Sequence, residues 1–203
     1  VLEEEVDYIL EHINRYVSPQ ILREDIKSVF AGLRPLVRSK EETSTALLSR
    51  DHTIVVSPSG LVTITGGKWT TYRKMAQDAV DNAVFISKLD KRLCITKNLP
   101  IGDPLSVQQK KEKMIQEDQG WASKLHPDFS YQWVDIAYAV RHEMAITVED
   151  VLARRTRVLF LDAQAALDCL EQVVLFMQKE LNQSDEWVQQ QKKDFIELVE
   201  GYL

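Results

Sequence analysis

The 203-residue sequence is poor in cysteine, in glycine and in basic residues. Its two cysteines, Cys94 and Cys169, lie far apart without C-x-x-C spacing, which argues against a disulfide framework or zinc site and favours a reducing compartment. Its seven glycines form no G-x-G-x-x-G fingerprint. The 25 Lys and Arg residues are outnumbered by 31 Asp and Glu, so we expect no nucleic-acid binding. Long apolar runs are missing too, so neither a transmembrane helix nor a signal peptide is expected.

The first part of the chain, residues 1–93, has the pattern of a mixed helix and sheet region. An amphipathic helix is expected from Val1, and because no initiator Met precedes it we expect the chain to be part of a longer protein. Segments rich in β-branched or aromatic residues predict strands at 28–37, 52–57 and 61–65. Residues 57–60 between the last two predict a hairpin turn. Three short strands predict only a fragment of an α/β sheet domain.

A linker with two prolines and a glycine, residues 94–106, separates this region from helices that fill residues 107–203. Thr147 and Asp150 have the spacing of a capping box that opens a short helix. Asp162 and Ser184 are expected to cap two longer amphipathic helices. The sequence therefore predicts a small all-α domain at the C-terminal end.

The stretch TGGKWTTYRKMA, residues 65–76, places two glycines and a lysine in front of a helix expected at about 70–89. A helix N-terminus has unpaired N–H groups and a positive dipole end, and Lys68 adds a charge, so an anionic group would fit there. Gly66 and Gly67 have no Cβ, and a ligand could then approach the backbone closely. A plain strand-to-helix turn with incidental glycines explains the same residues, and both interpretations stay open.

Three arginine-containing stretches also allow two interpretations, one as a binding site and one as part of the fold. Arg34 in FAGLRPLV and Arg50 in LSRDHTI, together with Lys68, predict a phosphate pocket, since guanidinium groups bind phosphate oxygens with two hydrogen bonds. The alternative pairs each arginine with a neighbouring carboxylate. ARRTR at residues 153–157 is interpreted as a solvated helix end, with an anion or domain contact as the alternative.

The motifs FAGLRPLV, SRDHTI and GLVTITGGKWTTYRKMAQDAV, in this order, resemble the FAD-dependent glycerol-3-phosphate dehydrogenase family. YAVRHEMAITVEDVLARRTRVLFLDAQAAL resembles the helical C-terminal domain of the same family. The resemblance implies an α+β fragment of an FAD/substrate-binding sheet domain followed by an all-α C-terminal helical domain. It also implies that the chain is the last third of such an enzyme and is inactive by itself.

The resemblance assigns roles to matching positions. It implies that the substrate phosphate is clamped by Arg34 and Arg50, that His52 lines the substrate site, and that Lys68 lies near substrate and flavin in a catalytic position. The residues implied to lie against the isoalloxazine are Gly66, Gly67, Lys68, Trp69 and Thr70. The catalytic base is expected upstream of Val1, and His142 is interpreted as an ordinary helix residue.

The implied reaction moves a hydride from glycerol 3-phosphate to FAD, gives dihydroxyacetone phosphate and passes electrons to a quinone. We expect peripheral association with the inner, cytoplasmic face of the cell membrane, with a homodimer as a possibility and no metal site. Two alternatives stay open: a glycerol-phosphate oxidase that uses oxygen, and a non-catalytic helical docking module.

Overall fold

The computed structural model describes residues 1–33 and 51–203. They form two compact units, which are described separately below. The first, the helical unit, joins Val1–Ala31 to Pro104–Leu203, and the second, the hairpin unit, comprises the described residues of Gly32–Asp103. Residues 1–31 thus group with the helical unit, whereas the sequence analysis placed them with the sheet fragment in residues 1–93.

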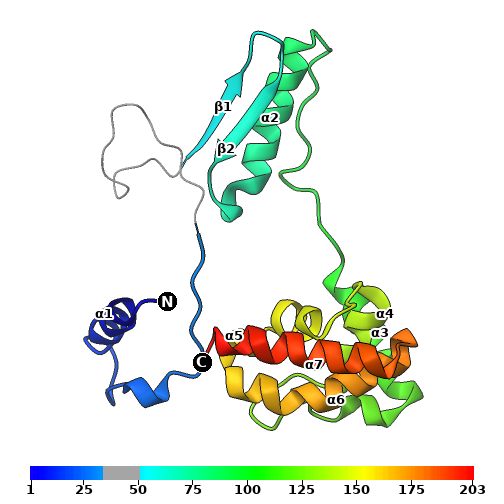
Figure 1. The fold of residues 1–203 in the computed structure, drawn as a ribbon. Helices are drawn as coiled ribbons and strands as arrows, with labels where there is room; N and C mark the ends of the chain where they lie inside the picture. Colours follow the sequence, from blue (N-terminus) through cyan, green and yellow to red (C-terminus); the bar gives the residue numbers. More distant parts are fainter. Residues whose placement is uncertain (34–50) are drawn as a thin grey trace. The chain divides into compact units, whose positions relative to one another are not determined.

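The hairpin unit consists of a two-stranded antiparallel sheet with one helix along it (Figure 1). Strand β1 (His52–Val56) pairs with β2 (Val62–Gly66) in a register that sets Ile54 opposite Ile64. The predicted turn is confirmed: the Gly60 amide donates to the Ser57 carbonyl at 2.9 Å, and Gly60 has a φ of 84°, which favours glycine.

The helix expected from Thr70 starts with a 3-10 turn, η3 (Trp69–Thr71), and continues as α2 (Tyr72–Ile86). Figure 1 shows α2 lying along β2. The strand expected at 28–37 does not form over residues 28–33, the described part of that range. In the described ranges the sheet has two strands, so the larger FAD-domain sheet stays an expectation.

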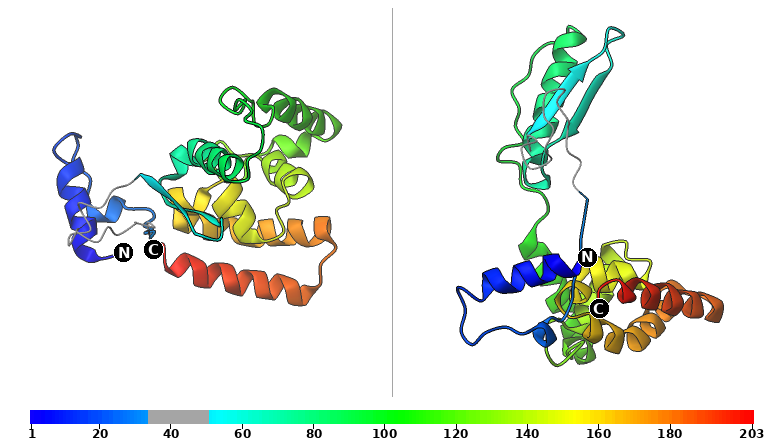
Figure 2. Two further views of the ribbon diagram at one scale, coloured as in Figure 1. Left: turned by 90° about the horizontal axis from the view of Figure 1, so that it is seen from above. Right: turned by 60° about the vertical axis from the view of Figure 1, so that its left-hand side comes forward.

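From Pro104 onward the helical unit is built from helices, as the sequence predicted for residues 107–203, and residues 1–31 add two more. Its elements are α1 (Glu3–Ile13), η1 (Arg23–Asp25), α3 (Pro104–Glu117), η4 (Gln119–Ala122), α4 (Trp133–His142), the π-helical turn η5 (Asp150–Arg155), α5 (Val158–Leu161), α6 (Ala163–Leu181) and α7 (Asp185–Glu200). Both views in Figure 2 show α6 and α7 side by side.

The core of the helical unit is formed by the apolar stripes predicted for α6 and α7. Val173, Val174 and Met177 of α6 are fully buried, and Phe195 and Val199 of α7 pack in the same cluster. The predicted caps are present as well. Asp162 Oδ1 accepts from the Ala165 amide at 3.0 Å, and Ser184 Oγ accepts from the Trp187 amide at 3.3 Å. Periodicity and capping residues therefore located these helices correctly.

An extended segment, residues 27–30, crosses the helical unit where the sequence predicted the start of a strand. Its backbone and side-chain contacts are Lys27 O with Ala163 N at 3.0 Å, Ser28 Oγ with Leu159 O at 2.8 Å, Val29 N with Tyr202 O at 2.9 Å, and Phe30 edge-on to Phe160 at 4.9 Å between ring centroids. The hydrogen-bonding groups of this segment are thus used by residues of the helical unit, and the segment does not pair with a strand.

Candidate functional site

The residues expected to face a ligand form a turn between β2 and α2, in which Gly66 and Gly67 are half-buried and residues 68–70 are exposed. Gly66 and Gly67 have φ values of 77° and 80°, in the left-handed region that glycine tolerates. The turn closes at Lys68, whose carbonyl accepts from the Thr71 amide at 2.9 Å and from Thr71 Oγ1 at 3.0 Å. The chain thus reverses sharply before α2 begins at Tyr72.

Packing inside the hairpin unit gives one reason for a glycine at position 67. A Cβ at this position would lie 2.5 Å from Met75 Sδ and 3.3 Å from His52 Cβ. The missing side chain therefore leaves room for α2 and β1 inside the hairpin unit. The positive φ and the packing of Met75 by themselves explain the glycine. That Gly67 also leaves an open approach for a ligand stays a prediction.

Lys68 and Trp69 give the turn its surface chemistry. Both side chains are exposed, and Trp69 is 85% exposed. Trp69 stacks on Tyr72 with 5.3 Å between ring centroids and an interplanar angle of 25°. Within residues 1–33 and 51–203, Lys68 forms no ion pair with a carboxylate. A free cation beside an exposed aromatic pair is suited to a planar ligand that carries negative charge.

His52 lies beside the same turn, as its position in the hairpin requires. It is the strand partner of Gly66, and its ring Nε2 lies 3.1 Å from Asp78 Oδ2 on α2. Lys74 Nζ binds the other oxygen of Asp78 at 2.5 Å. The sequence analysis did not select Lys74 and Asp78. Their i,i+4 spacing on a predicted helix could have indicated the ion pair between them.

The two proposed phosphate ligands, Arg34 and Arg50, lie outside the residues that the structure describes. Their roles stay predictions from the family resemblance. Of the predicted site residues, the structure brings together His52, Gly66 and Gly67 through the strand register and the packing of the turn. Lys68, Trp69 and Thr70 follow directly in the chain.

A cavity of about 630 Å³ lies between α2 and residues 92–101, on a part of the unit that the sequence did not identify. Arg73 Nη1 binds Thr96 Oγ1 at 3.3 Å, and Cys94 Sγ lies 3.1 Å from the same oxygen. The hydrogen bonds with Thr96 are the main cause that lowers the pKa of the Cys94 thiol. Most other lining side chains are apolar, among them Leu93, Ile95, Leu99 and Ile101.

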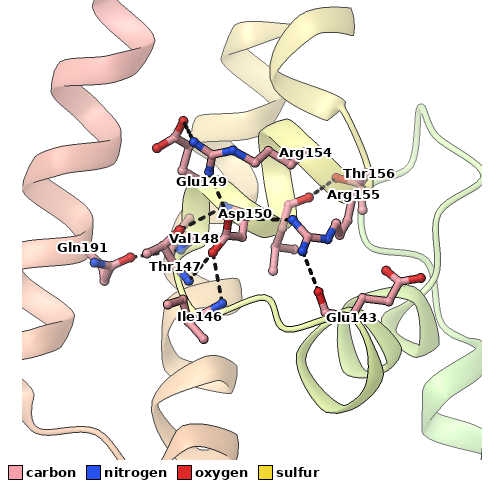
Figure 3. A network of polar contacts seen from close by, with 11 residues as sticks. Glu143, Ile146, Thr147, Val148, Glu149, Asp150, Arg154, Arg155, Thr156 and Gln191 are labelled. Carbon is pink, nitrogen blue, oxygen red and sulfur yellow. Dashed lines mark hydrogen bonds and ion pairs between the residues drawn. The ribbon is translucent and has the colours of Figure 1, made fainter. Parts of the chain in front are cut away.

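The ARRTR segment is held by its own helical unit (Figure 3). Arg154 binds Asp150 Oδ1 at 3.0 Å and Glu149 Oε1 at 2.5 Å, and Arg155 donates to the Glu143 carbonyl at 2.5 Å. The predicted capping box is present, since Thr147 N donates to Asp150 Oδ2 at 3.0 Å and Asp150 N donates to Thr147 Oγ1 at 3.1 Å. The first two arginines therefore serve the fold, as the interpretation of a helix end expected.

Other predicted features are simple to place. Cys94 and Cys169 are free, and His142 is exposed and lies against Tyr138 at 4.7 Å between ring centroids. The described part of the chain contains no group of three His, Cys, Asp or Glu residues suited to a metal ion. Nor does any of its helices combine the length and the apolar character that a membrane span needs.

Comparison with known proteins gives one consistent family. Residues 106–188 match the family described as the C-terminal domain of alpha-glycerophosphate oxidase. A probable mitochondrial glycerol-3-phosphate dehydrogenase of Caenorhabditis elegans is 36% identical over 220 residues, which cover 90% of this chain and 30% of that protein. Mitochondrial glycerol-3-phosphate dehydrogenases of Arabidopsis thaliana and Mus musculus are each 30% identical over 99% of this chain, which corresponds to 38% and 32% of their lengths.

The chain spans about a third of the length of the curated relatives that it matches. The matches extend over both units, and the family match for the C-terminal domain falls within the helical unit. Over most of its length the chain therefore matches the C-terminal portion of glycerol-3-phosphate dehydrogenases, as the sequence motifs predicted.

Proposed function

We propose that this chain is the C-terminal part of an enzyme that oxidises glycerol 3-phosphate to dihydroxyacetone phosphate with FAD as the hydride acceptor. The proposal is supported by the names of the relatives, which are glycerol-3-phosphate dehydrogenases. Within the structure it depends on one observation, the exposed turn in which Lys68 has no carboxylate partner among the described residues and Trp69 stacks on Tyr72.

The residues of this turn fit a flavin. A flat aromatic ring system suits the exposed Trp69–Tyr72 pair, and a group that gains negative charge suits Lys68 and the N–H groups at the start of η3. FAD would supply the hydride acceptor of the reaction. The residues Gly66, Gly67, Lys68, Trp69 and Thr70 would hold its ring, with Lys68 providing a positive charge next to it.

Substrate binding is assigned to His52, Arg34 and Arg50. The two arginines, outside the described residues, would bind the phosphate, because a guanidinium group matches phosphate oxygens in charge and geometry. His52 would contact the glycerol part, since it lies beside Gly66 and Gly67 at the end of β1. Lys68 would lie between the substrate and the flavin and neutralise negative charge on either of them.

The proposed enzyme could pass its electrons to a quinone, as a dehydrogenase, or to oxygen, as an oxidase. Quinone is favoured by the dehydrogenase names of the relatives, and oxygen is favoured by the oxidase named in the C-terminal family match. We propose quinone, together with peripheral attachment to the inner, cytoplasmic face of a membrane and a homodimer as the candidate assembly. The relatives are named as mitochondrial, and where this protein resides belongs to the same proposal.

Turnover measurements on the enzyme that carries this chain test the function. Glycerol 3-phosphate is supplied with a soluble quinone analogue under argon, or with oxygen as the sole acceptor. Rapid turnover with the quinone and slow peroxide formation support the dehydrogenase, and the reverse supports the oxidase. If glycerol 3-phosphate is oxidised with neither acceptor and does not bleach the flavin absorbance, the proposed function is wrong, and a docking module becomes the better interpretation.

A further inference from the structure

His52 and Asp78 form a pair at the base of the Gly66–Gly67 turn. His52 comes from β1 and Asp78 from α2, and the 3.1 Å contact between Nε2 and Oδ2 connects these two elements. The side chains are 20% and 25% exposed, so both are largely shielded from water. A Cβ built at Gly67 would lie 3.3 Å from His52 Cβ, which places the histidine against the turn.

The carboxylate determines which nitrogen of the imidazole carries a hydrogen. An ionised carboxylate can only accept hydrogen bonds, so the Nε2 that faces Asp78 must be the donor. Nδ1 of a neutral ring then keeps its lone pair and can accept a hydrogen bond. A histidine without such a partner exchanges between both tautomers and rotates about its side-chain bonds.

Lys74 keeps Asp78 ionised, so that its carboxylate accepts the hydrogen bond from His52. Lys74 lies one helical turn before Asp78, and its Nζ is 2.5 Å from Oδ1, the oxygen that His52 does not use. The hydrogen bond from Lys74 is the largest cause of the lowered pKa of Asp78, with a smaller contribution from His52. Each oxygen of Asp78 therefore has its own donor.

We propose that Asp78, held by Lys74, is a positioning residue that fixes the His52 ring with Nε2–H toward α2 and leaves Nδ1 to accept a hydrogen bond from a substrate hydroxyl. This inference rests on the proposed function, because the hydroxyl is that of the glycerol phosphate assigned to this turn. Asp78 acts through His52, and a fixed acceptor lowers the entropic cost of aligning the hydroxyl that reacts.

A measurement on the chain itself tests the pair without flavin or substrate. The Nε2–H proton of His52 is followed by proton–nitrogen NMR in protein labelled at its four histidines, with assignment by His52→Gln. We expect a slowly exchanging Nε2–H signal in the unaltered chain and exchange at least about tenfold faster in Asp78→Asn. Asp81→Asn is the matched control, since it removes an equal charge from the same helix at an exposed position.

A second measurement tests the role in catalysis. In the enzyme that carries this chain, Asp78→Asn should lower kcat for glycerol 3-phosphate by about 10–100-fold, with KM changed by less than about threefold. Asp78→Glu should restore part of kcat. Asp78→Asn combined with His52→Gln should be no slower than His52→Gln alone, because the two residues act as one unit.

The two arms separate the inference from the function on which it rests. A His52 ring that exchanges equally fast in the unaltered chain and in Asp78→Asn would overturn the pairing, and so would a hydrogen on Nδ1 alone. Additive kcat losses in the double variant, or an equal loss in Asp81→Asn, would overturn the positioning role. An enzyme inactive toward glycerol 3-phosphate would refute the proposed function and the substrate role together, while the exchange data still decide whether Asp78 holds His52.

Discussion

Lys27 Nζ lies 2.8 Å from Asp162 Oδ2, although 135 residues separate the two in the sequence. The same carboxylate caps α6 through the Ala165 amide, and Asp162 is buried while the Lys27 side chain remains exposed. The pair lies where residues 27–30 cross the helical unit. One side chain therefore fixes both the start of a core helix and the path of a distant segment.

We predict that Asp162→Ala lowers the free energy of unfolding of the helical unit by about 1–2 kcal/mol, the usual effect of losing an N-cap. Asp162→Asn should be milder, since asparagine also caps helices and loses only the charge interaction with Lys27. Urea denaturation followed by circular dichroism measures both. Equal losses in the two variants would contradict the idea that the cap outweighs the ion pair.

Acid should destabilise the helical unit through three carboxyl groups. Burial by itself raises the pKa values of Asp162 and Asp150, but hydrogen bonds from Lys27 and the Ala165 amide, and from Ile146 and Thr147, outweigh it and lower both. The hydrogen bond from Arg141 lowers the pKa of Glu180. Groups with a lowered pKa in the folded state stabilise the fold above their ordinary values, 3.8 for Asp and 4.5 for Glu, and lose this contribution as the pH falls through their folded values.

The free energy of unfolding should therefore fall between about pH 5 and about pH 2, and this fall should be shallower in Asp150→Asn. Denaturation curves at several pH values measure the slope. An equally steep fall in that variant would show that Asp150 does not take part. Glu197→Gln provides the control, since it removes one carboxyl from an exposed position on α7.

Gly67→Ala should destabilise the hairpin unit by about 1–2 kcal/mol, because a non-glycine residue is strained at a φ of 80°. Crowding of the new Cβ against Met75 adds to the loss, and the combination with Met75→Ala should remove only the crowding. Thermal unfolding of the chain tests this. A chain with an unchanged midpoint would return Gly67 to a role in ligand approach alone.

Lys68→Met should leave the thermal midpoint of the chain nearly unchanged, since Lys68 is exposed and has no ion pair within the described ranges. In the flavin-containing enzyme the same change should lower the reduction potential, because the reduced cofactor loses a positive neighbour. Spectroelectrochemical titration measures the potential. If it does not move, Lys68 does not lie near the flavin.

Arg34→Ala should weaken glycerol 3-phosphate binding by roughly ten- to over a hundredfold, the effect of losing a charge-assisted contact worth about 1.5–3 kcal/mol. Flavin content should be unchanged. Arg34 lies outside the described residues, so this prediction comes from the family motif FAGLRPLV. Titration calorimetry with the enzyme, alongside its flavin absorbance, distinguishes a lost phosphate contact from a lost fold.

The sequence by itself determined the helices of the C-terminal region, the hairpin turn and the resemblance to glycerol-3-phosphate dehydrogenases. Apolar residues recur in α6 and α7 with the period of a helix that has one buried face. Asp162 and Ser184 mark where the two helices begin, because their side chains cap the N-termini. The turn at residues 57–60 could also be predicted from a short stretch of sequence, because glycine favours the positive φ that Gly60 adopts there. The family was readable because its motifs are contiguous stretches.

The tertiary structure decided what depends on contacts between distant residues. It directed residues 28–33 away from a strand, since Ser28 and Val29 bond to Leu159 and Tyr202. It also gave Gly67 its packing reason, because Met75 reaches the position of the missing Cβ only after α2 folds back on β2. His52 and Asp78 meet for the same cause. Sequence patterns record the periodicity of one element, whereas these contacts depend on how two elements pack together.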